Sequence, residues 1–243
     1  YQGPFIFLLR NHPEKAMRFI TDLVDDATEF FGLQKYPMDY VSGPGKVNVR
    51  LRDGTVREIW CNDRLWNAYR ATSVMPNVLN CALMAFERWL LEHIEVPAHQ
   101  KFVLSVLNWI LKNSDSAALI SVVASVCMAR PKVASGQAIS VLGCREFFGL
   151  DMRRSVQESS AMVFGSLGAM DKIFQDERLE SNRLPHRNGS LEDLARNLQF
   201  TNAKDELLAL LDYHRGQIPA IDDTEEENRI WRLEFAIREL RAS

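Results

Sequence analysis

The residues closest to a nucleotide-binding motif lie at positions 42–47, where a lysine follows two glycines and a proline. A Walker A loop needs a glycine five residues before the glycine of its Gly-Lys pair, and a hydroxyl directly after the lysine to hold magnesium. Those two positions are Tyr40 and Val47 here. The segment also leads into a predicted strand, whereas a phosphate loop leads from a strand into a helix. We therefore exclude a phosphate loop and interpret the segment as a turn before a hairpin.

Histidine and cysteine spacing does not predict a metal site. No two of the five histidines lie one helical turn apart, as two ligands on one helix face would. His93 and His99 flank Pro97, so a joint site there is the weaker alternative. The cysteines lie far apart, unlike those of zinc sites and disulfide scaffolds. They are Cys61, Cys81, Cys127 and Cys144. We expect reduced, buried thiols, no metal and no cofactor.

No residue is predicted to be catalytic. No serine lies in a Gly-x-Ser-x-Gly elbow. Asp25 with Asp26, and Asp151 with Arg153 and Arg154, are interpreted as exposed helix charges. The acids at 222–227 fit the N-terminus of a helix, where its dipole favours negative charge. The sequence thus predicts no catalytic residue and no cofactor-binding residue.

Five side chains are candidates for contact with a partner: Trp60, Trp66, Arg183, His186 and Arg187. The two tryptophans bracket the exit of the predicted hairpin, although packing of the hairpin onto helices is the favoured alternative. The other three lie in a polar loop that could bind an anion. A solvated loop without function is the favoured alternative there.

Helices must position these side chains, because apolar residues recur at helical spacing along most of the chain. Helices are expected over residues 13–31, 77–94 and 114–128, and from 97 and 131 onward. Alternating apolar residues around Asp53 and Gly54 predict a β-hairpin. The predicted fold is therefore mainly α. It is an irregular α-solenoid or helical bundle of antiparallel, roughly HEAT-like helix pairs, with one inserted β-hairpin at about 47–60.

A polar stretch at 176–189 divides the predicted organisation. Residues 1–175 form a helical array with the hairpin, 176–189 a loop or linker, and 190–243 a C-terminal helical segment packing on the array. Capping-box patterns begin at Ser190 and Thr224, and each predicts the start of a helix.

The composition is that of an ordinary globular protein, with 47% hydrophobic and 25% charged residues. The formal net charge of -3 gives no bulk attraction to nucleic acid or anionic lipid, although a nucleic-acid partner stays open. The apolar runs are too short to span a bilayer, so we expect no membrane contact and a cytoplasmic location. The chain begins at Tyr1 without a methionine, which suggests a piece of a longer protein.

Several stretches resemble the long helical region beyond the nucleotide-binding core of large bacterial STAND-type ATPases (NACHT or AAA-like), many of them anti-phage defence proteins. These stretches are PFIFLL and PEKA near the start, SVMPNVLNCALMAFERWLL at 73–91, SVVASVC at 121–127, and LLDYHR, QIP and EENRIWRL toward the end. The resemblance implies a sensor or scaffold that recognises a trigger, such as a phage protein, and relays this to an ATPase domain elsewhere in the parent chain.

Three functions follow as hypotheses. The first is a non-catalytic recognition or regulatory segment, whose partner is a protein trigger, a nucleic acid or the ATPase domain in cis. The second is a structural platform that forms homo-oligomers. The third is an enzyme with an unrecognised site, for example around His186.

Overall fold

The computed structural model describes residues 3–33, 43–70, 75–160 and 183–217. Two helices open the chain, α1 (Gly3–Asn11) and α2 (Pro13–Leu33). Pro13 occupies the first turn of α2, where its missing N–H costs no hydrogen bond. Ile20 and Val24 on α2 are fully buried. Helix α1 packs against α4 (Asn77–Ile94), which α2 also contacts.

The hairpin consists of β1 (Gly45–Arg50) and β2 (Val56–Cys61), paired antiparallel. Gly54 has a φ of 86°, the left-handed conformation that glycine adopts without strain in a tight turn. Val49 and Ile59 are buried on the face that meets the helices. The predicted hairpin is confirmed and begins two residues earlier than expected.

Two backbone hydrogen bonds attach the hairpin edges to the helical part. On the β2 side, the Trp60 N–H donates to the Asp115 carbonyl at 2.8 Å. On the β1 side, the Arg50 N–H donates to the Gly143 carbonyl at 3.2 Å. A bare two-stranded hairpin is marginal in water, so this attachment stabilises it.

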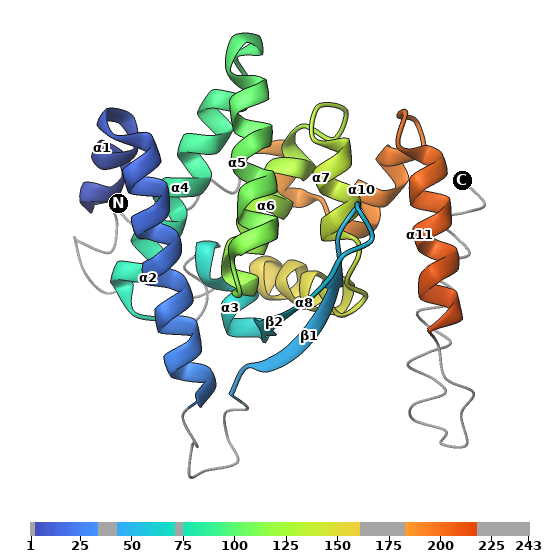
Figure 1. The fold of residues 1–243 in the computed structure, drawn as a ribbon, viewed down its shortest axis with the longest axis horizontal. Helices are drawn as coiled ribbons and strands as arrows, with labels where there is room; N and C mark the ends of the chain where they lie inside the picture. The colour runs from blue at the N-terminus through green and yellow to red at the C-terminus, as the bar shows by residue number, and fades with distance from the viewer. Residues whose placement is uncertain (1–2, 34–42, 71–74, 161–182, 218–243) are drawn as a thin grey trace.

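The middle of the chain is a run of helices that surround α6 (Ala117–Ala129). These are α3 (Asp63–Asn67), the 3-10 helix η1 (Ala68–Arg70), α4, the 3-10 helix η2 (Pro97–His99), α5 (Gln100–Asn113), α7 (Ser135–Val141) and α8 (Glu146–Ser160). Nearly every residue of α6 is buried, as its all-round apolar sequence predicts. Helix α6 contacts helices from both halves of the chain and lies near the middle of the molecule (Figure 1).

The described part closes with the 3-10 helix η4 (Pro185–Asn188), α10 (Leu191–Leu198) and α11 (Lys204–Gly216). Ser190 and Asp193 form the predicted capping box at the start of α10. Helix α10 contacts α6 and α8, and α11 contacts α7. Half of the predicted linker and the helix expected from Thr224 lie outside the described residues, so the division into domains stays a prediction.

The fold is thus mainly α, with one antiparallel hairpin among the described residues, which confirms the predicted class. Of the helices in this part of the chain, none is both long enough and apolar enough to cross a membrane.

Candidate functional site

Trp66 belongs to the core. Its side chain is 1% exposed, and its ring lies 4.6 Å from that of Phe147, centroid to centroid. The indole Nε1 donates to Asp151 Oδ1 at 3.3 Å. Trp66 is therefore buried among the helices, as the packing alternative predicts, and it also makes a hydrogen bond to Asp151.

Trp60 lies half-buried on the last turn of α2. A Cβ added at Gly32 would lie 2.8 Å from the indole ring, so the glycine permits this close approach. The Lys46 ammonium lies 5.0 Å from the centroid of the same indole, within range of a cation–π interaction. Trp60 therefore attaches the hairpin to α2.

The three polar-loop candidates take different environments. Arg183 is exposed and His186 is half-buried. Arg187 is buried, and its Nη2 pairs with the carboxylate of Glu87 on α4. The loop therefore sends one arginine into the core, instead of presenting three side chains together to solvent.

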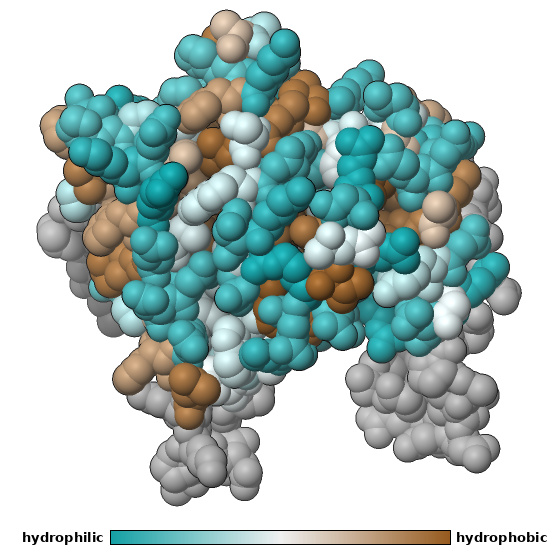
Figure 2. All heavy atoms as spheres, viewed as in Figure 1, coloured by the Kyte–Doolittle hydropathy of each residue, from teal (hydrophilic) through white to brown (hydrophobic). Residues whose placement is uncertain are grey.

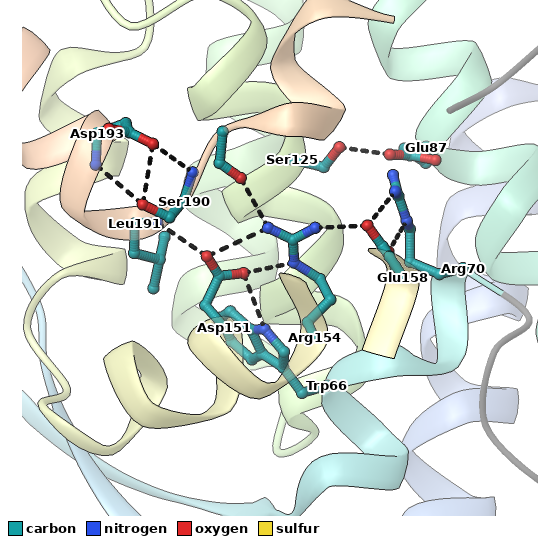
Figure 3. A network of polar contacts seen from close by, with 11 residues as sticks. Trp66, Arg70, Glu87, Ser125, Asp151, Arg154, Glu158, Ser190, Leu191 and Asp193 are labelled. Carbon is teal, nitrogen blue, oxygen red and sulfur yellow. Dashed lines mark hydrogen bonds and ion pairs between the residues drawn. The ribbon is translucent and has the colours of Figure 1, made fainter. Parts of the chain in front are cut away.

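The pair formed by Arg187 lies in a larger cluster of buried polar residues from η1, α3, α4, α6, α8, η4 and the start of α10. Figure 3 draws this network without Arg187. At its centre, Asp151 accepts from Arg154 Nε at 2.7 Å and from Arg154 Nη2 at 3.3 Å. Asp151 also accepts from the Leu191 N–H, at the start of α10, at 2.8 Å. With the indole of Trp66, the carboxylate of Asp151 links three elements.

Glu158 extends the network along α8. It accepts from Arg154 Nη1 at 2.8 Å and from Arg70 Nη2 at 2.6 Å. Arg154 Nη2 also donates to the Gly189 carbonyl at 2.8 Å, which fastens the segment between η4 and α10. Spacings of three and four residues place Asp151, Arg154 and Glu158 on one face of α8.

Glu87 is buried within α4 at the edge of the network, close to the charges of Arg70, Arg154 and Glu158. Its carboxylate accepts from Ser125 Oγ on α6 and from Arg187. Burial raises the pKa of Glu87 to about 7, while the Ser125 hydrogen bond and nearby guanidinium groups oppose this. The direct contact with Arg187 favours the ionised carboxylate.

The side chain of His186 lies beside this cluster and makes no hydrogen bond to the residues that the structure describes. Burial, together with the positive charges of Arg70 and Arg154, lowers the pKa of His186 to about 4. The imidazole is therefore neutral at pH 7, and its buried Nε2 has no hydrogen-bond partner in the described part of the chain. A neutral imidazole avoids adding a further positive charge beside the arginines.

The ion pairs within the network limit the catalytic chemistry that its carboxylates could perform. Each of its carboxylates, on Glu87, Asp151 and Glu158, accepts from an arginine, so none is a ready general base. A hollow of about 180 Å³ adjoins Asp151 between α8 and α10, lined also by Phe148, Met152 and Leu191. Small-molecule sites are typically about 300–1,000 Å³, so this hollow is small for one. In the described part of the chain, no three His, Cys, Asp or Glu residues are placed to hold a metal ion.

The sequence interpretation missed this network. Asp151 and Arg154 were expected on the surface, but each is 1% exposed. Of the three residues in that expectation, Arg153 is the one that reaches solvent, where it pairs with Asp63. The available signal was the Asp-x-x-Arg-x-x-x-Glu spacing on the same helix as Phe147, which permits mutual neutralisation inside a core.

No protein-family model and no curated protein matches this chain. The resemblance to STAND-type ATPases therefore stays a prediction.

Proposed function

We propose that this chain is a non-catalytic recognition or regulatory helical segment of a larger signalling or defence ATPase, binding a protein or nucleic-acid trigger. The net charge of -3 favours a protein trigger over a nucleic acid. The observation that supports the proposal most is that the buried charges pair with one another and are not free for catalysis. Arg70, Arg154 and Arg187 pair with Glu158, Asp151 and Glu87. The Arg187 pair attaches η4 to α4, and the bonds from the Leu191 N–H to Asp151 and from Arg154 to the Gly189 carbonyl attach the start of α10 to α8.

The exposed surface supports the same function. Large apolar side chains are exposed to solvent on α1 and α2, at Phe7, Phe19 and Phe30, and in the turn after α10, at Phe200. Exposed apolar side chains become protein contact sites where they gather into one patch. The four cysteines are free, which is compatible with the reducing cytoplasm where we place the protein.

The test compares the full-length parent protein with a form that lacks this segment. We expect nucleotide hydrolysis to keep its basal rate and to lose its response to the trigger. The isolated chain should bind the same trigger in solution. A truncated parent that still responds fully, together with an isolated chain that does not bind the trigger, would overturn the proposal.

Self-association is the second candidate function, because Phe7 is 66% exposed and Phe200 is 76% exposed. Sedimentation velocity over a concentration series separates the two. A strict monomer at the highest concentration removes this candidate.

A further inference from the structure

A second apolar stripe runs along α2 beside the buried one. Phe19, Leu23, Asp26, Phe30 and Leu33 recur at alternating spacings of four and three residues. This spacing places them on one line of the helix and is that of a coiled-coil seam. Phe19, Phe30 and Leu33 are 51%, 61% and 68% exposed.

The second stripe takes part in packing only at its edge, where Leu23 is half-buried against the core and the Phe19 ring stacks on that of Phe5 on α1, 6.3 Å between centroids. The buried stripe of Met17, Ile20, Val24 and Thr28 already faces the neighbouring helices. Figure 2 shows hydrophobic atoms in solvent where α2 ends, at the lower left of the molecule. Ordinary amphipathic helices carry polar residues at such positions.

Negative charge lies within the stripe, at Asp26, and next to it. Asp22, Asp26 and Glu29 are exposed, and none of them has an ion-pair partner among the described residues. Between Phe19 and Leu33 the helix contains no lysine or arginine.

This arrangement is unfavourable for α2 itself. Glu29 lies close to the last turn of α2, where the helix dipole favours cations. Asp22 and Asp26 also lie one turn apart, where like charges repel. A cation beside this face would relieve both effects.

We infer that this face docks an amphipathic helix of a protein partner, with an apolar stripe and lysine or arginine around it. We name it the acidic seam, and it comprises Phe19, Asp22, Leu23, Asp26, Glu29, Phe30 and Leu33. The inference rests on the proposed function and names its contact surface. Coiled-coil spacing fits a helix, and the seam is about 21 Å long, which a partner helix of about 15 residues would cover. Its negative charge disfavours nucleic acid and anionic membranes.

The experiment uses two synthetic helical peptides and the intact 243-residue chain. Both peptides carry leucines at alternating four- and three-residue spacing; one has lysines at its polar positions and the other glutamates. Fluorescence anisotropy should show the lysine peptide binding at least about tenfold more tightly, with affinity falling as salt rises.

Variants then locate the contact. Phe30→Ser should weaken binding about tenfold, as loss of an apolar anchor does. The double variant Asp22→Lys with Asp26→Lys should reverse the preference toward the glutamate peptide. Phe200→Ser, which removes an exposed phenylalanine elsewhere, is the matched control and should leave the affinity unchanged.

Three results would overturn the inference. The first is equal binding of the two peptides, and the second is an unchanged preference in the double variant. The third is a dimer in sedimentation that Phe30→Ser abolishes, which would assign the seam to a second copy of the chain. If one of these three results occurs while deletion of the segment still abolishes the parent's response to the trigger, the proposed function stands and only the docking surface is wrong.

Discussion

Asp151 is the residue on which the buried network depends most. Its carboxylate meets Trp66, Arg154 and the Leu191 N–H, each from a different element or turn. A buried ion pair is not strongly stabilising by itself, but removing one partner leaves an uncompensated charge in the core. The network is therefore sensitive to single substitutions.

We expect Asp151→Asn to destabilise the protein by about 3 kcal/mol, because Arg154 loses a charged partner at a site where water cannot replace it. Asp63→Asn is the matched control. Asp63, on α3, pairs at 2.6 Å with the exposed Arg153, which lies on the same helix as Asp151. That exposed pair should contribute less than about 1 kcal/mol. Urea unfolding measures both, and equal losses would contradict a clamp centred on Asp151.

Gly143 has a role that its neighbours in sequence do not reveal. A Cβ at this position would lie 1.9 Å from the Arg50 carbonyl oxygen, which is backbone and cannot rotate away. Gly143→Ala should therefore displace β1 and destabilise the fold by about 1–3 kcal/mol, the range for overpacking. Gly45→Ala meets open space on the same strand and serves as control. Thermal melting of both variants measures the difference. Equal melting temperatures would contradict a close contact between Gly143 and the Arg50 carbonyl.

At the scale of elements, a carboxylate joins α2 to the connection between α5 and α6. Asp25 Oδ1 accepts from Ser114 Oγ at 2.7 Å and from the Asp115 N–H at 3.2 Å. Burial raises the pKa of Asp25 to about 7; the Ser114 hydrogen bond opposes this, and the negative charge of Asp115 adds to it. Asp25 was expected to be an exposed charge and is instead partly buried.

The sign of the resulting pH dependence follows from the raised pKa. The folded state keeps the proton on Asp25 up to about pH 7, whereas the unfolded chain releases it near pH 4. The contribution of Asp25 to the free energy of unfolding is greatest below pH 4. It falls as the pH rises to about 7, by at most about 1.4 kcal/mol per pH unit. Asp25→Asn, which can still accept both hydrogen bonds, should flatten this fall.

Asp22→Asn on the same helix is the matched control for Asp25→Asn, since Asp22 is exposed. Unfolding free energies at pH 5 and pH 8 provide the comparison. An unchanged difference between the two pH values in Asp25→Asn would show that other groups set the pH dependence.

At the scale of the whole molecule, η4 and α10 are held by both packing and charge. Leu191, Leu194 and Leu198 are buried, and Arg187 reaches back to Glu87 on α4. Segments held by few contacts open independently of the rest of a protein. Regulation through this segment would begin with such local opening.

We expect Arg187→Ala to raise amide hydrogen exchange in η4 and α10 more than in α1 and α2, because Glu87 loses its partner from η4. Arg183→Ala, at an exposed position on the same loop, should leave exchange unchanged. Uniform acceleration across all helices would instead indicate loss of global stability.

Helices and hairpin were predictable because their signals are local. The apolar spacing of α2, the alternation around Gly54 and the capping box at Ser190 each act within a few residues. The candidate site was not predictable in the same way. Glu87 and Arg187 are 100 residues apart, and their pairing requires that α4 and η4 meet.

The sequence by itself determined a mainly α protein, the positions of most described helices and the place of the hairpin. Tertiary structure decided which charges are buried, since a carboxylate enters a core only where a guanidinium group arrives to neutralise it. It also decided that one apolar stripe of α2 is covered while the acidic seam faces solvent. Local periodicity records that a helix side is apolar; which side finds a neighbour depends on the packing of the other helices.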